Sequence, residues 1–319
     1  MIADLYNQIT RTAGLIDQPN LCWIEVKGKE ARDFLHSLLT NDIKKLTGQR
    51  GCYALLLTPK GKLIADLFCY TCEDYFGIVC EDFLKKTILE TLQKFIIVRD
   101  VQLKDQSQKW GAVTVIGEKA AEILAKKIGT LPTKKFEYNY VKLDEITLYN
   151  IHKTLWGFPA YELWAYREQI PTLKEKLNLP EIATEQQEIL RIESATPKFC
   201  VDMDENTIPQ EANLHEALSF TKGCYIGQEI VTRLEHRGHV GKQLIQLKVE
   251  GTEPPARGEK IFVGEEEAGT ITSSCFSPKH NSVLALGTVR YQFLKESTPD
   301  QIHKLVARFR VGTKTAEHL

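Results

Sequence analysis

The sequence predicts an α+β fold of more than one domain that ends in a small β-barrel. Helical and strand-like hydrophobic patterns alternate between residues 28 and 128, without an internal repeat. After residue 240 the apolar runs become short and are separated by glycine or proline, as in barrels and sandwiches. The 319 residues also exceed what one hydrophobic core usually supports, so we expect two or three domains.

The first part of the chain can be assigned in order up to residue 128. Residues 28–39 carry apolar side chains at helical spacing, and Thr40-Asn41-Asp42 then predicts a helix stop. Pro59-Lys60-Gly61-Lys62 separates two apolar runs and predicts a hairpin turn. The predicted elements are helices at 28–39, 82–95 and 118–128 and strands at 53–57, 63–72 and 110–116. Residues 129–188 show no clear boundaries.

The C-terminal part is predicted to form the β-barrel. Its strand-like runs are 244–247, 260–263, 268–272 and 283–289. We place the domain boundary near Arg237-Gly238. Residues 1–238 are then expected to form two interleaved α+β domains, and residues 239–319 the barrel domain.

Composition limits the function classes. A formal net charge of -1 and a pI near 6.7 give no general attraction to nucleic acid or anionic membranes. The N-terminus lacks the apolar stretch of a signal peptide, and no segment approaches the roughly 18 apolar residues of a membrane span. We therefore expect a soluble cytoplasmic protein whose eight cysteines are reduced.

Cys69 and Cys72 form a C-x-x-C pair. They lie in a predicted strand before a Glu73-Asp74 turn, where residues three apart point to opposite faces. That geometry opposes a shared metal, and no second C-x-x-C completes a zinc site.

Residues 222–229, KGCYIGQE, are the most informative segment of the chain. Gly223 and Gly227 permit backbone conformations and close approaches that suit a ligand loop. The ammonium of Lys222 would stabilise a thiolate at Cys224, which makes Cys224 the best candidate for a reactive or metal-ligating sulfur. The alternative is that Cys224 is a small buried core residue and the glycines only mark a turn. The dense polar surroundings favour the ligand loop.

KGCYIGQE, together with the LTND and LTPKG segments near the N-terminus, resembles the YgfZ-type folate-binding proteins. These are relatives of the glycine-cleavage aminomethyltransferase, the T-protein. The likeness spans residues 30 to about 245 and is weaker beyond. It implies a three-domain ring around a central hole that holds tetrahydrofolate or a one-carbon derivative, with residues 1–238 as the folate-binding region and a C-terminal β-barrel.

The resemblance also implies a function. Members support the assembly or maintenance of iron-sulfur clusters in particular enzymes and thereby affect tRNA thiolation. The implied partners are iron-sulfur enzymes or their assembly factors. By the same analogy Cys224 is the functional thiol, and its motif neighbours Lys222, Gln228 and Glu229 shape the site.

A pterin offers a flat ring and a donor edge that one carboxylate can accept. Glu193 is the candidate carboxylate, because Leu190-Arg191-Ile192-Glu193 resembles the T-protein's pterin-proximal strand; alternatively, Glu193 faces solvent on that strand and pairs with Arg191. Tyr225 is the candidate for stacking, or else a core residue. The cations expected to hold the glutamate tail, unless they form only a solvated surface, are Lys222, Arg233 and Arg237.

One departure from the T-protein concerns Ala65-Asp66, where the aminomethyltransferase has two adjacent aspartates. Losing one acid removes a group placed to transfer a proton or to stabilise developing charge, so aminomethyl transfer is not expected. Asp66 then either binds folate or caps a turn. No metal is expected at His236 and His239, since a loop gives them no common face, and Cys224 alone supplies one of the four ligands that stable clusters need.

Three hypotheses follow. The leading one is a tetrahydrofolate-binding accessory protein for iron-sulfur enzymes with Cys224 as its thiol. The second is a folate-dependent methyl or aminomethyl transferase in which Asp66 is the remaining acid. The third is a tRNA-binding module that uses local cations, and the near-zero net charge and the lack of an RNA motif make it the least favoured. Its cations would be Lys222, Arg233, Arg237 and Lys242.

Overall fold

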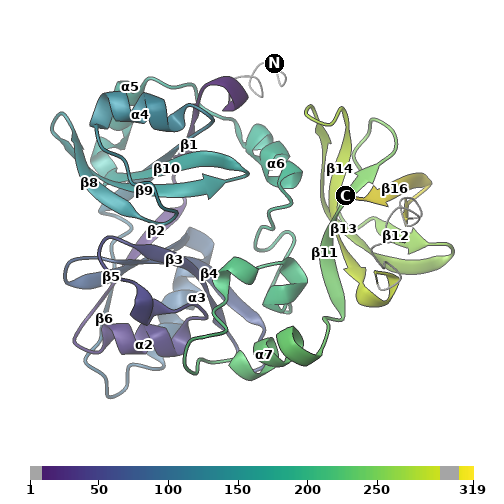
Figure 1. Ribbon diagram of the computed structural model, residues 1–319, viewed down its shortest axis with the longest axis horizontal. Coiled ribbons are helices and arrows are strands. Elements are labelled where there is room, and N and C mark those ends of the chain that lie inside the picture. The colour runs from purple at the N-terminus through teal and green to yellow at the C-terminus, as the bar shows by residue number, and fades with distance from the viewer. Residues whose placement is uncertain (1–8, 295–308) are drawn as a thin grey trace.

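The computed structural model describes residues 9–294 and 309–319, apart from the side chain of Arg237. This part of the chain contains two five-stranded sheets and a closed barrel. The two sheets lie one above the other, and the barrel stands beside them across the segment that carries α6 (Thr184–Glu193) (Figure 1). The prediction of an α+β fold with a C-terminal β-barrel is confirmed.

The first sheet has the order β3-β4-β5-β2-β6 and is antiparallel throughout. Helices α2 (Ala31–Leu38) and α3 (Asp82–Gln93) cover one face and bury Phe34 and Ile88 against it. The predicted helices at 28–39 and 82–95 are therefore confirmed, with slightly shorter bounds. The strands are β2 (Leu21–Lys27), β3 (Gly51–Leu57), β4 (Leu63–Thr71), β5 (Tyr75–Glu81) and β6 (Gln102–Asp105).

The second sheet has the order β1-β7-β10-β9-β8, and helices α4 (Ala120–Ile128) and α5 (Ile170–Leu177) cover its outer face. Because β1 comes from the N-terminal side of the first sheet, the two α+β units are interleaved in sequence. Three of these strands and α5 fill the region that the sequence left unassigned. The strands are β1 (Gly14–Gln18), β7 (Trp110–Ile116), β8 (Tyr138–Leu143), β9 (Ile146–Leu155) and β10 (Phe158–Tyr166).

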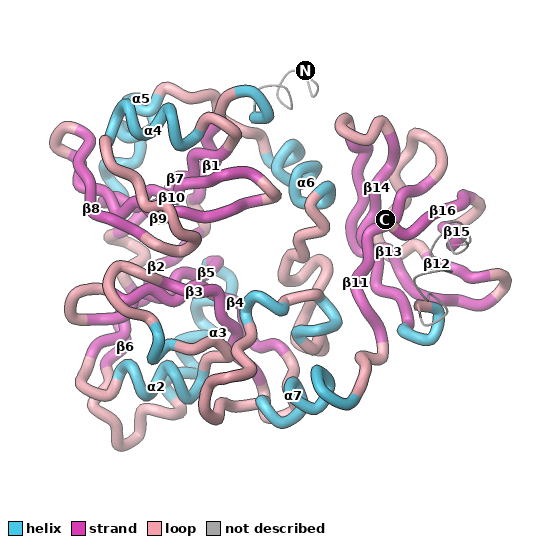
Figure 2. The backbone as a smooth tube through the Cα atoms, in the orientation of Figure 1, coloured by secondary structure: helices cyan, strands magenta, loops and turns pink. Residues whose placement is uncertain are grey.

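One sheet lies above the other (Figure 2). An aromatic cluster lies between their inner faces, and we call it the junction. Trp23 of β2 packs edge to face on Trp164 of β10, with ring centroids 5.1 Å apart. Successive side chains along each strand point to opposite faces of the sheet, so this aromatic cluster is separate from the helix-covered cores. Cys69, for example, faces the α2–α3 side and Cys72 the junction, so the prediction that the two cysteines point to opposite faces is confirmed.

The barrel closes in the order β11-β14-β13-β12-β15-β16, with β16 paired to β11. The four predicted barrel strands are confirmed, and each lies within an observed strand. Among the described residues, no helix is long and apolar enough to cross a membrane. The barrel strands are β11 (Lys242–Val249), β12 (Lys260–Val263), β13 (Glu266–Ser277), β14 (Ser282–Arg290), β15 (Phe309–Val311) and β16 (Lys314–His318).

The predicted strand at residues 190–193 is wrong, because these residues form the last turn of α6. The helix begins after Ala183, whose N–H donates to the Gln186 side chain at 2.8 Å. Two apolar residues among four are too few to distinguish a strand from a helix by periodicity, and the glutamate and glutamine residues before them favour the helix.

Candidate functional site

Asp66 lies on the junction face of β4. Its Oδ2 accepts a hydrogen bond from the Tyr53 hydroxyl at 2.9 Å. Burial raises the pKa of Asp66 above the ordinary aspartate value, although the hydrogen bond from Tyr53 acts in the opposite direction. The site therefore contains a carboxyl group that keeps its proton to higher pH than an exposed aspartate.

Ala65 points the other way, into the core beneath α2 and α3, because neighbouring strand residues face opposite sides of a sheet. A carboxylate at this position would be buried among apolar side chains. The alanine therefore leaves the number of acids facing the junction unchanged. The difference from the T-protein's aspartate pair does not by itself remove proton or charge chemistry at Asp66.

A buried ion pair that the sequence reasoning missed lies on the other side of the junction, on the second sheet. Lys153 of β9 donates to Glu162 Oε2 at 2.5 Å, and Trp164 Nε1 donates to Glu162 Oε1 at 2.8 Å. The Lys153 ammonium lies 3.9 Å from the centroid of the Phe68 ring, which in turn contacts Tyr53 at 5.1 Å. A chain of contacts through Lys153, Phe68 and Tyr53 thus connects Glu162 to Asp66.

Glu81, at the end of β5, completes this acidic group. Partial desolvation, followed by the negative charge of Asp66, raises the pKa of Glu81, and Glu162 contributes in the same sense. Glu81 is therefore influenced by the charges of both Asp66 and Glu162. The sequence held a signal for Glu162, since a carboxylate within the otherwise apolar segment Tyr161–Trp164 needs a buried partner.

The loop of residues 222–227 packs against the LTPKG hairpin. Gly227 has φ +85°, and a Cβ added there would lie 2.7 Å from the Thr58 carbonyl oxygen and 3.2 Å from Gly61 Cα. Only glycine combines this conformation with so close an approach. The two sequence segments that carry the family resemblance therefore form one structural unit, with Gly227 as the N-cap of α7 (Gln228–Arg237).

Lys222 is a buried cation, with 7 % of the residue exposed. Its ammonium donates to the carbonyl oxygens of His36 and Leu39, both at 2.5 Å, and lies 4.8 Å from the centroid of the Tyr225 ring. It thereby satisfies carbonyls at the C-terminus of α2. Burial lowers the pKa of Lys222 to about 8. No hydrogen bond among the described residues joins it to Cys224.

Cys224 is exposed, so the alternative that it is a buried core residue is wrong. Tyr225 is buried in an apolar cluster that also contacts Tyr53, which connects the motif to the partner of Asp66. The other motif residues lie on α7. Gln228 and Glu229 form its first turn, and Arg233 is exposed further along it, whereas the Arg237 side chain lies outside the described part of the chain.

Glu193 lies at the barrel contact. Its Oε1 accepts from the Ser277 hydroxyl of β13 at 2.5 Å. It does not pair with Arg191, whose guanidinium instead binds Glu188 and Asp202. Among the described residues, Glu193 is thus held at the barrel by Ser277, whereas Asp66 and Glu162 accept hydrogen bonds at the junction.

The two histidines after the motif contact aromatic rings. His239 stacks on Tyr291 with ring centroids 4.4 Å apart, and His236 lies 6.2 Å from Phe220. In residues 9–294 and 309–319 no group of three or more histidine, cysteine or acidic side chains is arranged to hold a metal ion.

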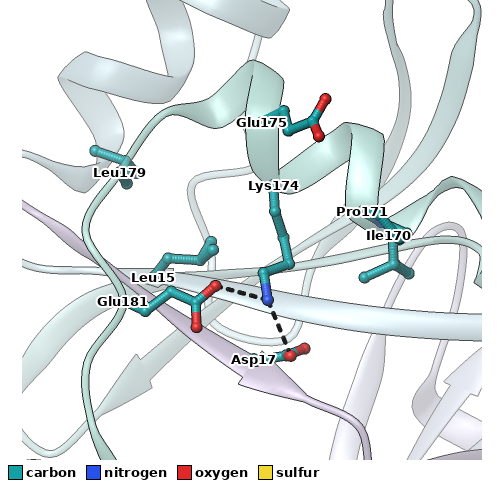
Figure 3. A pocket seen from close by; sticks show the side chains of 8 residues that line it. All are labelled: Leu15, Asp17, Ile170, Pro171, Lys174, Glu175, Leu179 and Glu181. Atoms are coloured by element: carbon teal, nitrogen blue, oxygen red, sulfur yellow. Dashed lines mark hydrogen bonds and ion pairs between the residues drawn. The ribbon is translucent and has the colours of Figure 1, made fainter.

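A hollow of about 450 Å³ lies between β1 and α5, away from the motif (Figure 3). Lys174 reaches across it to Asp17 at 3.0 Å and Glu181 at 2.6 Å. Glu175 also lines it, so three carboxylates oppose a single ammonium. This charge balance disfavours an anionic ligand.

The model of the GCVT N-terminal domain matches residues 1–222, and that of the glycine cleavage T-protein C-terminal barrel domain matches residues 242–311. The chain belongs to the glycine-cleavage T-protein family. The first match ends at Lys222, and the second begins with β11.

Curated members of the T-protein family are similar over most of their length. An aminomethyltransferase from Caldanaerobacter subterraneus subsp. tengcongensis is 28 % identical over 300 residues, which cover 90 % of this chain and 80 % of the relative. One from Alkaliphilus oremlandii is 24 % identical over 323 residues, covering 97 % and 87 %. The crystal structure of the glycine cleavage system aminomethyltransferase T from Bartonella henselae has the same fold, with a TM-score of 0.86 at 20 % identity, covering 100 % of this chain and 88 % of that one.

Proposed function

We propose that the chain binds tetrahydrofolate, or one of its one-carbon derivatives, beside the acidic side of the junction. The observation that carries this proposal is the placement of Asp66 and Glu162 on the two facing sides of the junction, with the rings of Tyr53 and Phe68 between them. Carboxylates accept the ring N–H groups of a pterin, and aromatic side chains pack on its flat ring. The resemblance to folate-binding relatives supports the same ligand.

The residues present fit a reduced pterin. Asp66 accepts only one described side-chain hydrogen bond, so it retains capacity to accept others. When bound, the folate would supply the carrier for a one-carbon unit. Tyr53 would orient the Asp66 carboxyl group, whose raised pKa suits it to hold a proton near the ligand.

The chain acts, in our proposal, as an accessory protein of the YgfZ type for iron-sulfur enzymes, with an indirect effect on tRNA modification. Two features support this reading: the KGCYIGQE signature and the exposed position of Cys224 within it. An exposed thiol is available to a partner enzyme or assembly factor, whereas the described cysteines of the sheets and barrel are largely buried.

A folate-dependent methyl or aminomethyl transferase is the second candidate. The matching curated relatives are aminomethyltransferases, and Ala65 does not reduce the acids that face the junction. In this candidate Asp66 would hold or accept a proton during transfer to an amine acceptor.

Two experiments separate the candidates. In a strain lacking the native gene, the accessory protein predicts that Cys224→Ser abolishes support of iron-sulfur enzyme activities while Cys200→Ser, the matched exposed cysteine, preserves it. Unchanged enzyme activities in the Cys224→Ser strain would reject the accessory reading. The transferase instead predicts turnover of folate one-carbon adducts by the purified protein with a panel of amine donors, and this turnover should fall with Asp66→Asn. No product with any donor would count against it.

A further inference from the structure

The loop between α3 and β6 exposes aliphatic side chains. Ile97 and Val98 are 86 % and 92 % exposed, and Phe95 just before them is 43 % exposed. Isoleucine and valine are among the residues most often buried. Two of them in succession at the surface, next to a partly exposed phenylalanine, indicate a contact surface.

This loop is ordered by several hydrogen bonds. Phe95 N–H donates to the Leu92 carbonyl at 3.0 Å, and Arg99 N–H donates to the Ile96 carbonyl at 2.8 Å. Asp100 N–H donates to Glu30 Oε2 at 2.7 Å. Ile96 packs against the core beneath the helices, so its neighbours Ile97 and Val98 project from a fixed turn. A fixed turn loses little conformational entropy when a partner covers it.

The strand that follows the loop is an open edge. Strand β6 pairs with β2 on one side only, and no described strand lies on its other side. Its outer N–H and C=O groups can therefore pair with an added strand. Gln102 follows Val98 by four residues, so one extended segment can reach both features.

Residues 94–105 carry three cations and two acids, and the Glu30 carboxylate lies beside Asp100. Lys94 and Lys104 are exposed and form no ion pair among the described residues. Arg99 lies 5.9 Å from the Phe34 ring, and Asp105 is already paired with Lys85 at 3.3 Å. Asp100 is the acid within the loop. A segment that carries acidic residues beside its apolar ones is complementary to this arrangement.

We propose that residues 94–105 are a docking surface for an extended acidic segment of a partner protein, which adds a strand to β6 and covers Ile97 and Val98. A second copy of the chain fits less well, because pairing two β6 strands would bring two sets of cations together. An anionic membrane would meet the exposed Glu30 and Asp100 and could not use the strand edge.

The test uses the full-length protein and a labelled nine-residue peptide of alternating glutamate and valine. Fluorescence anisotropy should show saturable binding that weakens at least about tenfold in the Ile97→Ser/Val98→Ser variant. Phe276→Ser, which alters an exposed phenylalanine on the barrel, should bind like the unaltered protein. Hydrogen exchange at residues 102–105 should slow when the peptide binds. Because Ile97 and Val98 are almost fully exposed, the double variant should keep the melting temperature of the unaltered protein.

Several outcomes would overturn the proposal. Equal binding by the double serine variant, or by a lysine-valine peptide, would show that the surface does not select an acidic apolar segment. Sedimentation of the unaltered protein, but not the variant, with phosphatidylserine vesicles would assign the loop to lipid. A concentration-dependent dimer that the variant loses would assign it to a second copy.

Discussion

Arg191 should be essential for stability, because it neutralises a buried carboxylate between α6, the following loop and the barrel. The Arg191 and Asp202 side chains are 5 % and 0 % exposed, and Nη1 lies 2.6 Å from Asp202 Oδ2. Arg191 also donates to the Ser273 hydroxyl of β13 at 2.8 Å. Arg191→Ala would leave the Asp202 charge buried without its cation, which costs about 3–5 kcal/mol. We expect the lower end, near 3 kcal/mol, because Lys198 N–H and two hydroxyl groups still donate to Asp202.

Urea unfolding at pH 7 and 25 °C, followed by tryptophan fluorescence and circular dichroism, measures this loss. Arg290→Ala, at an exposed arginine of the barrel, is the matched control and should change the free energy of unfolding by no more than about 0.5 kcal/mol. Adding Asp202→Asn to Arg191→Ala should restore part of the stability, since the buried charge is then gone. A loss below about 1 kcal/mol for Arg191→Ala, or no recovery in the double variant, would refute the reasoning.

Three further predictions concern the motif. In the folded protein the pKa of Lys222 falls from the ordinary 10.5 to about 8. Between these pH values the unfolded chain binds more protons, so the free energy of unfolding relative to that of Lys222→Met should rise with pH, by up to about 3 kcal/mol. A pH-independent difference between the two proteins would contradict this. Gly227→Ala should destabilise the protein by about 2 kcal/mol. The loss should exceed that of Gly129→Ala, because Gly129 shares a positive φ but has open space around it. Equal losses in urea unfolding would show that the contact with Thr58 is unimportant. Titration of the native protein with a thiol reagent should give two fast-reacting cysteines, Cys200 and Cys224, and Cys224→Ser should leave one; a fast phase unchanged by that substitution would disprove the exposure of Cys224.

The sequence predicted those elements whose local signals agree with their surroundings. The helix that ends before Thr40, the LTPKG hairpin and the four barrel strands carry clear periodicity and turn residues, and each is observed. Strands β8 to β10 were not assigned, because polar side chains on them such as Tyr138 and Lys153 are buried by the facing sheet, which no local pattern reveals. The last turn of α6 was misassigned because two apolar residues among four do not distinguish a helix from a strand.

The candidate site was predictable only in part. KGCYIGQE indicated a special loop, and Gly227 and exposed Cys224 agree with that expectation. The Lys222 ammonium binds carbonyl oxygens at the end of α2, which lie 183 and 186 residues away in sequence. Residue spacing within the motif could not predict these contacts. The pairing of Asp66 with Tyr53 and of Lys153 with Glu162 joins neighbouring strands within one sheet, so predicting it required the register of each strand pair.

Calorimetric titration with tetrahydrofolate tests most directly whether the acidic side of the junction is a folate site. We predict saturable binding of one folate per chain, weakened at least about tenfold by Asp66→Ala and unchanged by Glu175→Ala, which alters the hollow beside α5. Equal affinity in the Asp66→Ala variant, or no binding by the unaltered protein, would contradict the proposed site.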